Sequence, residues 1–94
     1  MLPEFLRLKG ELLLAVTPEN AAEAGSWFQQ ALDVAQELGA RMLELRAAIS
    51  LCRLWRDQGK AEQGRRVLND AYDRFTEGFT TADLMEAEDL LRQN

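Results

Sequence analysis

Arginine residues gather in one stretch of an otherwise acidic chain. Seven Lys and Arg but only three Asp and Glu fall within residues 41–66, whereas the whole chain of 94 residues has a formal net charge of −5. Arg46, Arg53 and Arg56 are seven and three residues apart, so they project from one side of a helix. A planar guanidinium suits carboxylates, because it can donate two parallel hydrogen bonds to them. These arginines therefore form a candidate surface for an acidic group.

Residue types that usually carry catalysis or hold metals are scarce. The chain has no histidine, which is the commonest general base and metal ligand. Its single cysteine, Cys52, falls among apolar residues of the same helical stretch, where we expect a buried structural thiol. The chain also lacks a GxxxxGK[ST] phosphate-binding loop. We therefore predict that it is not an enzyme and has no catalytic residue, metal or cofactor.

Charge and hydropathy limit the partners further. The acidic balance disfavours general binding to nucleic acid. No apolar run approaches the roughly 20 residues that span a bilayer. The short apolar run at 12–16 follows charged residues and does not form a signal peptide. We expect a cytoplasmic protein with no membrane contact.

The composition predicts an all-α fold. Ala, Leu, Glu, Gln and Arg dominate, and valine and isoleucine are scarce. The only prolines, Pro3 and Pro18, suit first helical turns, Thr17 suits a helix cap, and Gly39 and Gly59 suit helix ends. We predict helices over residues 3–16, 18–38, 41–58, 60–75 and 82–92. The remaining segment is expected to form a turn at 76–79 with Phe79 under the helices, followed by a cap at Thr80 or Thr81.

The predicted helix over 41–58 has two apolar stripes, whereas a helix at the edge of a small protein needs only one. It should therefore lie between two neighbours. One stripe consists of Met42, Leu45, Ile49 and Cys52, and the other of Leu43, Ala47, Leu51, Leu54 and Trp55.

Two successive helical pairs share a pattern of small and large residues. Gly10 corresponds to Cys52, while Ala24, Phe28 and Ala31 correspond to Gly64, Leu68 and Ala71. This order resembles the tetratricopeptide repeat (TPR), in which small residues allow close helix contact. The first pair departs from that family by about two extra residues between Gly10 and Ala24. The second pair fits the family best. The residues that fall at the family's spacings are Leu51, Cys52, Trp55, Gly59, Gly64, Leu68 and Ala71.

This resemblance implies a single TPR-like domain over residues 1–94, wound as a right-handed α–α superhelix. Its parts are a hairpin at about 3–38, a second hairpin at about 41–75 and a capping helix at about 81–92.

A wider resemblance covers nearly the whole chain. LRLKGELLL at 6–14, the stretch 27–60 and YDRFTEGFTTADLMEAEDLL at 72–91 are similar to the C-terminal end of large bacterial regulators. These regulators are predicted ATPases with helical repeats, often joined to an adenylate-cyclase-type or DNA-binding domain. The resemblance implies a part in a signalling system of that kind.

In TPR arrays, the first helix of each hairpin lines an inner groove. When the groove positions of the family are transferred to this sequence, the resemblance implies a groove for an acidic peptide or partner helix. The alternative is that its arginines pair with Glu4, Glu11 or Asp57 or stay in water. The groove residues are Arg7, Glu11, Arg46, Ile49, Arg53 and Arg56.

Apolar residues cover much of the circumference of the predicted helix over 3–16, so part of that surface should be exposed. Exposed apolar surface usually marks an interface. We therefore predict self-association through Phe5, Leu8 and Leu12, and a function as a non-catalytic protein–protein interaction module. Its partner is an acidic peptide, a helix or a second copy. The alternative is a small binder of anionic ligands or nucleic acid that uses the arginine-rich helix.

Overall fold

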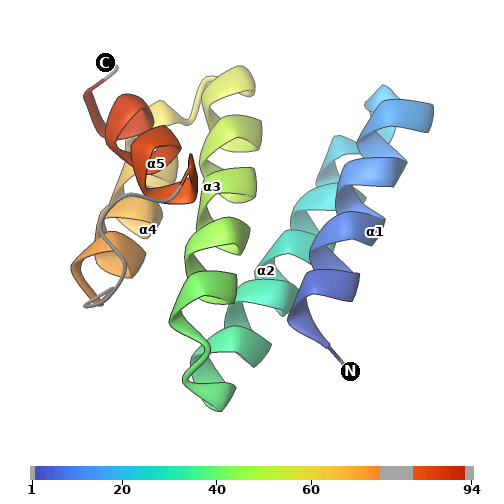
Figure 1. Ribbon diagram of the computed structural model, residues 1–94. Helices are drawn as coiled ribbons and strands as arrows, with labels where there is room; N and C mark the ends of the chain where they lie inside the picture. The colour runs from blue at the N-terminus through green and yellow to red at the C-terminus, as the bar shows by residue number, and fades with distance from the viewer. Residues whose placement is uncertain (1, 75–81, 93–94) are drawn as a thin grey trace.

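The computed structural model shows an all-α fold of five helices, as predicted, and it describes residues 2–74 and 82–92. Consecutive helices pack against each other (Figure 1). The predicted turn at 76–79, the position of Phe79 and the cap at Thr80 or Thr81 lie outside the described residues. The helices are α1 (Pro3–Val16), α2 (Ala21–Leu38), α3 (Arg41–Asp57), α4 (Ala61–Arg74) and α5 (Ala82–Arg92).

The junction between α1 and α2 differs from the prediction. Residues Pro18–Asn20 form one 3₁₀ turn, so α2 begins at Ala21. The predicted side-chain cap by Thr17 is wrong, because its side chain makes no capping hydrogen bond. The Thr17 backbone bonds to both sides of the junction instead. Its N–H donates to the Leu13 carbonyl at 2.8 Å, and its carbonyl accepts from the Asn20 N–H at 2.9 Å.

At the other end of α2, the prediction is confirmed. Gly39 has a φ of 67°, in the left-handed region that glycine adopts without steric cost. This geometry lets the Gly39 and Ala40 N–H groups bond back to the last turn of α2. The chain therefore turns at once into α3.

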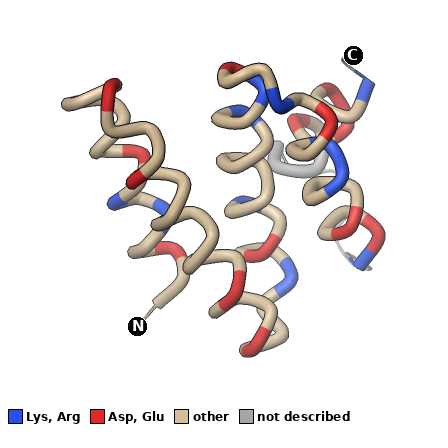
Figure 2. Tube along the Cα trace, turned by 180° about the vertical axis from the view of Figure 1, so that it is seen from behind, with Lys and Arg blue, Asp and Glu red and all other residues tan. Residues whose placement is uncertain are grey.

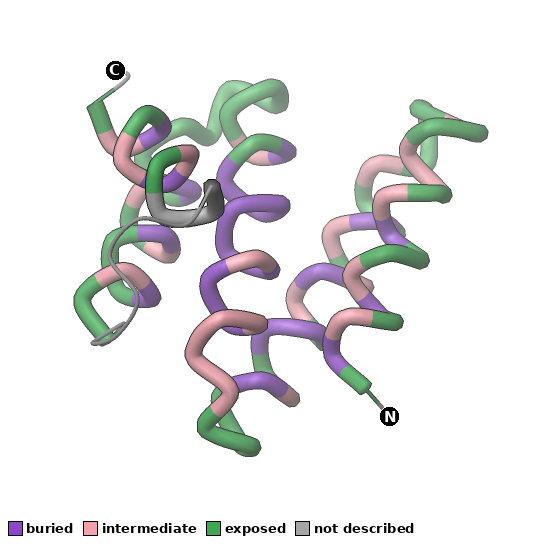
Figure 3. The backbone as a smooth tube through the Cα atoms, in the orientation of Figure 1, coloured by how far each residue is buried: buried purple, intermediate pink, exposed green. Residues whose placement is uncertain are grey.

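Helix α3 is the centre of the packing, as its two apolar stripes predict. It contacts all four other helices, and its middle turns are buried (Figure 3). Leu45 and Leu51, one from each stripe, are fully buried, and each contributes about 1.5–3 kcal/mol through burial. A helix with two buried faces cannot be stable alone in water, so α3 depends on neighbours from both sides in sequence.

Small residues set the close approach within each helical pair. A Cβ atom added to Gly10 would lie 2.6 Å from Cε1 of Phe28, and one added to Gly64 would lie 2.9 Å from Cα of Cys52. The predicted close contact at Gly10 is therefore confirmed. The added Gly10 Cβ would also lie 3.1 Å from the carbonyl oxygen of Ala24. In the sequence correspondence, Gly10 matches Cys52 and Ala24 matches Gly64. The contact between Gly10 and Ala24 in the first pair is therefore equivalent to the contact between Cys52 and Gly64 in the second.

The five helices form two rows. Helices α1, α3 and α5 contact each other in turn, and they lie in front in Figure 1, with α2 and α4 behind. Between the described parts of α2 and α4 there is no contact. Within the described ranges, no helix is long and apolar enough to cross a membrane. The predicted groove residues lie on α1 and α3 of the first row.

Candidate protein-interaction site

Two cavities lie along the row of α1, α3 and α5, and Arg53 lines both. The first has a volume of about 270 Å³ and includes Arg7, Arg46, Ile49 and Arg53 from the predicted groove. The second, of about 460 Å³, includes Glu11 with an apolar wall of Leu14, Pro18, Ala21 and Leu54. The structure thus brings five of the six predicted groove residues to one face. The sixth, Arg56, is exposed and pairs with Asp57 at 3.5 Å.

Carboxylates of the same chain neutralise this row of arginines. Figure 2 shows Lys and Arg along α3 and acidic residues on the helices around it. Arg7 donates to Glu4 at 2.7 and 2.9 Å, and Arg46 lies 3.8 Å from the same carboxylate. Arg53 forms an ion pair with Glu86 of α5. An acidic ligand in this groove would therefore compete with carboxylates that are already in place.

A buried serine connects α3 to α1. Ser50 is only 3% exposed. Its hydroxyl donates to Oε2 of Glu11 at 2.9 Å and accepts from Nη1 of Arg7 at 3.3 Å. This contact was not predicted, although a serine between apolar residues of a buried helix signals that a polar partner must reach it. The contact fixes Arg7 and Glu11 at the edge of the groove.

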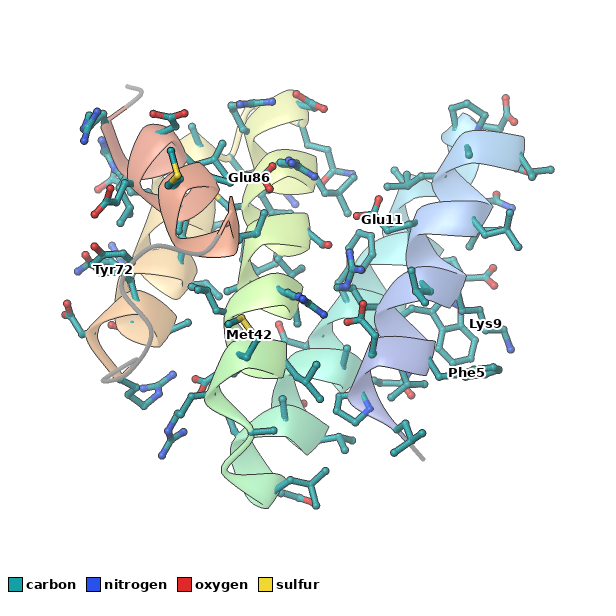
Figure 4. All side chains as sticks on the ribbon, viewed as in Figure 1. Phe5, Lys9, Glu11, Met42, Tyr72 and Glu86 are labelled. Carbon is teal, nitrogen blue, oxygen red and sulfur yellow. The ribbon has the colours of Figure 1, made fainter. Side chains whose placement is uncertain are left out.

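Among the described side chains, polar contacts tie α5 to both α3 and α4. Glu86 points toward α3 and pairs with Arg53, while the hydroxyl of Tyr72 on α4 donates to Glu88 at 2.7 Å (Figure 4). That hydrogen bond is the main reason that the pKa of Tyr72 lies above its ordinary value. Glu86 and Glu88 thus hold α5 against its neighbours.

The most buried charged group of the described chain lies away from the groove. Glu44 is fully buried. It accepts hydrogen bonds from Nε and Nη2 of Arg74 at 2.8 and 2.5 Å, from Nη1 of Arg41 at 2.9 Å and from Nε2 of Gln36 at 3.3 Å. Burial by itself would raise the pKa of Glu44, but the hydrogen bonds from Arg74, Arg41 and Gln36 outweigh it and hold the pKa below the ordinary value. Glu44 therefore joins α2, α3 and α4 as a carboxylate.

Lowering the pH should remove the stabilisation that the Glu44 carboxylate gives to the fold. Because the folded pKa of Glu44 lies below the ordinary 4.5, its stabilisation is complete above that value and is lost as the pH falls from it toward the folded pKa. We expect the difference in unfolding free energy between the wild type and Glu44→Gln to shrink between about pH 6 and about pH 3. Urea denaturation at several pH values measures it. A difference that stays constant over the range would contradict the assignment.

Cys52 is buried, as the sequence predicts. Burial raises the pKa of its thiol, against the opposing fields of Arg56, Arg65 and Arg53. Its Cα lies close to Gly64, in the helix contact described above. The thiol is therefore a packing group. In the described part of the chain, no cluster of three or more His, Cys, Asp or Glu could hold a metal ion.

The outer face of α1 carries a continuous apolar stripe. The predicted self-association residues Phe5, Leu8 and Leu12 are 59%, 52% and 65% exposed, and Leu2 and Val16 extend the stripe at both ends. Figure 4 shows Phe5 on the side of α1 that faces away from α3. These exposures amount to an apolar area on the order of 500 Å², the size of the largest patches on monomeric proteins, which are often functional.

Comparison of the chain with protein-family models, with curated proteins and with solved structures finds no match.

Proposed function

We propose that this chain is a non-catalytic protein–protein interaction module and that the α1 stripe is its interface. The observation that carries the proposal is the exposure of Phe5, Leu8 and Leu12 on one helix face. Single exposed leucines are ordinary on protein surfaces, but five large apolar residues along one short helix are not. Covering them against a partner would remove their area from water and supply the main driving force for association.

The module is TPR-like in this proposal, with two hairpins, a capping helix and the right-handed superhelix of that family. The support is the equivalence of the Gly10 and Gly64 contacts and the row of α1, α3 and α5. A capping helix covers the open end of a stacked array, and the contacts of α5 with both α3 and α4 support this role. The link to a bacterial signalling ATPase rests on the sequence resemblance alone.

The stripe is favoured over the arginine groove as the main interface because of charge. Arg7, Arg46 and Arg53 are each paired with a carboxylate of the chain, so a ligand would replace ion pairs rather than add them. Nothing in the described structure favours an anionic ligand or nucleic acid. The stripe requires no such exchange, since its apolar side chains face water in the single chain.

Charges placed in the stripe should block association. We expect Leu8→Glu/Leu12→Glu to weaken self-association by about tenfold or more, because each buried carboxylate would lose its hydration without a partner. Light scattering over a concentration series measures the effect. Both leucines are more than half exposed in the single chain, so the variant should fold normally, which circular dichroism checks.

A matched control comes from the same chain. Leu38 and Met85 are 63% and 62% exposed but lie on α2 and α5. The variant Leu38→Glu/Met85→Glu adds the same two charges off the stripe, and we expect it to associate like the wild type. Equal mass profiles for both variants would show that the stripe is not the interface.

A further inference from the structure

The exposed residues of α1 follow a coiled-coil spacing. Phe5, Leu8, Leu12 and Ala15 are three, four and three residues apart, and all four are exposed. In heptad terms they occupy successive a and d positions, the seam along which two helices interlock. The opposite face of α1, with Leu6 and Gly10, is buried in the fold. The two faces are therefore separate, and a second helix can cover the seam without disturbing the core.

We propose that the occupant of this seam is a second copy of the same chain, with the two α1 helices parallel about a two-fold axis. This inference rests on the proposed function and adds the partner and its orientation. A seam of this kind is self-complementary under two-fold symmetry, since each copy offers the same residues at the same heights.

The charges beside the seam select the parallel orientation. Lys9, at an e position, lies on one flank, and Glu4 and Glu11, at g positions, lie on the other. Figure 4 shows Lys9 on the side of α1 away from α3 and Glu11 on the side toward it. In a parallel pair, the acidic flank of each copy lies beside Lys9 of the other, and Glu4 and Lys9 have the five-residue offset of g to e pairs. An antiparallel pair would set like charges against each other.

The existing contacts of these groups are compatible with this pairing. Lys9 is exposed, with its Nζ 4.2 Å from the centre of the Trp27 ring, so its flank is fixed by packing. The Glu11 carboxylate is 36% exposed while it binds Arg7 and Ser50, and a carboxylate can accept about four hydrogen bonds. The Glu4 carboxylate is 29% exposed while it pairs with Arg7 and Arg46. Each acidic group can therefore keep its bonds within the chain and still attract Lys9 of a second copy.

The size of the seam sets the expected strength. Even with Leu2 and Val16 at its ends, the apolar area, on the order of 500 Å² per copy, is less than the roughly 800 Å² per partner of a standard stable interface. We therefore expect a reversible dimer with a dissociation constant on the order of micromolar.

Disulfide trapping distinguishes the two orientations. In a parallel pair, residue 15 lies opposite residue 15 of the second copy, so Ala15→Cys should form a covalent dimer under mild oxidation. In an antiparallel pair, residue 15 lies opposite residue 5, and two copies of residue 15 are about 15 Å apart, beyond the roughly 4.4–6.8 Å between Cα atoms that a disulfide needs. No other substitution is needed in the full chain, because its own thiol, Cys52, is buried.

The experiment oxidises Ala15→Cys, Phe5→Cys and their equimolar mixture, with wild type and the exposed-site variant Ser26→Cys as controls. Each stripe variant is expected to form a disulfide-linked homodimer, and the mixture is expected to form no disulfide between the two different variants. A disulfide that forms only between the two different variants would overturn the parallel arrangement while leaving α1 as the interface. A wild type that stays monomeric by light scattering, with no disulfide from any variant, would overturn the second copy as the occupant while leaving the α1 stripe available to a different protein.

Discussion

Glu44→Ala is expected to lower the free energy of unfolding by about 3 kcal/mol. The change removes four hydrogen bonds, three of them from arginines, and leaves a space in a fully buried site. Breaking a buried ion pair costs most when the remaining charge is buried. Here Arg41 and Arg74 are 40% and 41% exposed and can return to water. The cost is therefore near the lower end of the roughly 3–5 kcal/mol for breaking a buried ion pair.

Urea denaturation followed by circular dichroism measures this loss. Glu44→Gln keeps the size of the side chain but not its charge, so it should fall between the wild type and Glu44→Ala. Glu37→Ala is the matched control, because Glu37 lies exposed near the end of α2. If Glu44→Ala is no less stable than Glu37→Ala, Glu44 does not hold the three helices together.

Gly64→Ala is expected to destabilise the fold by about 2 kcal/mol. The added Cβ would lie 2.9 Å from Cα and 3.0 Å from the carbonyl oxygen of Cys52. These are backbone atoms of α3, so relief requires the two helices to move apart. The gain of about 1 kcal/mol in helix propensity from glycine to alanine does not offset that movement in a packed core.

The same substitution at Gly25 provides the comparison. An added Cβ there meets only Cδ2 of Leu54 at 3.3 Å, the flexible end of a side chain. We expect Gly25→Ala to leave stability unchanged or to raise it slightly through helix propensity. Thermal or urea unfolding of both variants measures the contrast. If Gly64→Ala is as stable as Gly25→Ala, the two helices do not approach each other through this glycine.

Features set by local periodicity could be predicted from the sequence. The two apolar stripes of α3 indicated a central helix, because three- and four-residue spacing fixes which side chains share a face. Gly39 indicated the end of α2 for an equally local reason, its access to a positive φ. The exposed face of α1 was also within reach, since apolar residues round most of a helix exceed what one neighbour can cover.

Contacts between distant residues could not be predicted in the same way. Glu44 binds Arg74, which is 30 residues further along the chain, and its burial depends on how α4 packs on α3. Arg53 likewise pairs with Glu86 of α5 rather than with a carboxylate of its own helix or of α1. Sequence spacing gives the side from which an arginine projects, but only the packing of helices decides which carboxylate reaches it.

The solution mass of the wild-type chain over a concentration series tests the central claim most directly. If α1 is a self-association surface, the mass by light scattering should rise from that of one chain to that of two between about 1 μM and about 1 mM. A mass that remains that of one chain throughout the series would contradict the claim, because the apolar stripe would then stay in water where a second copy is abundant.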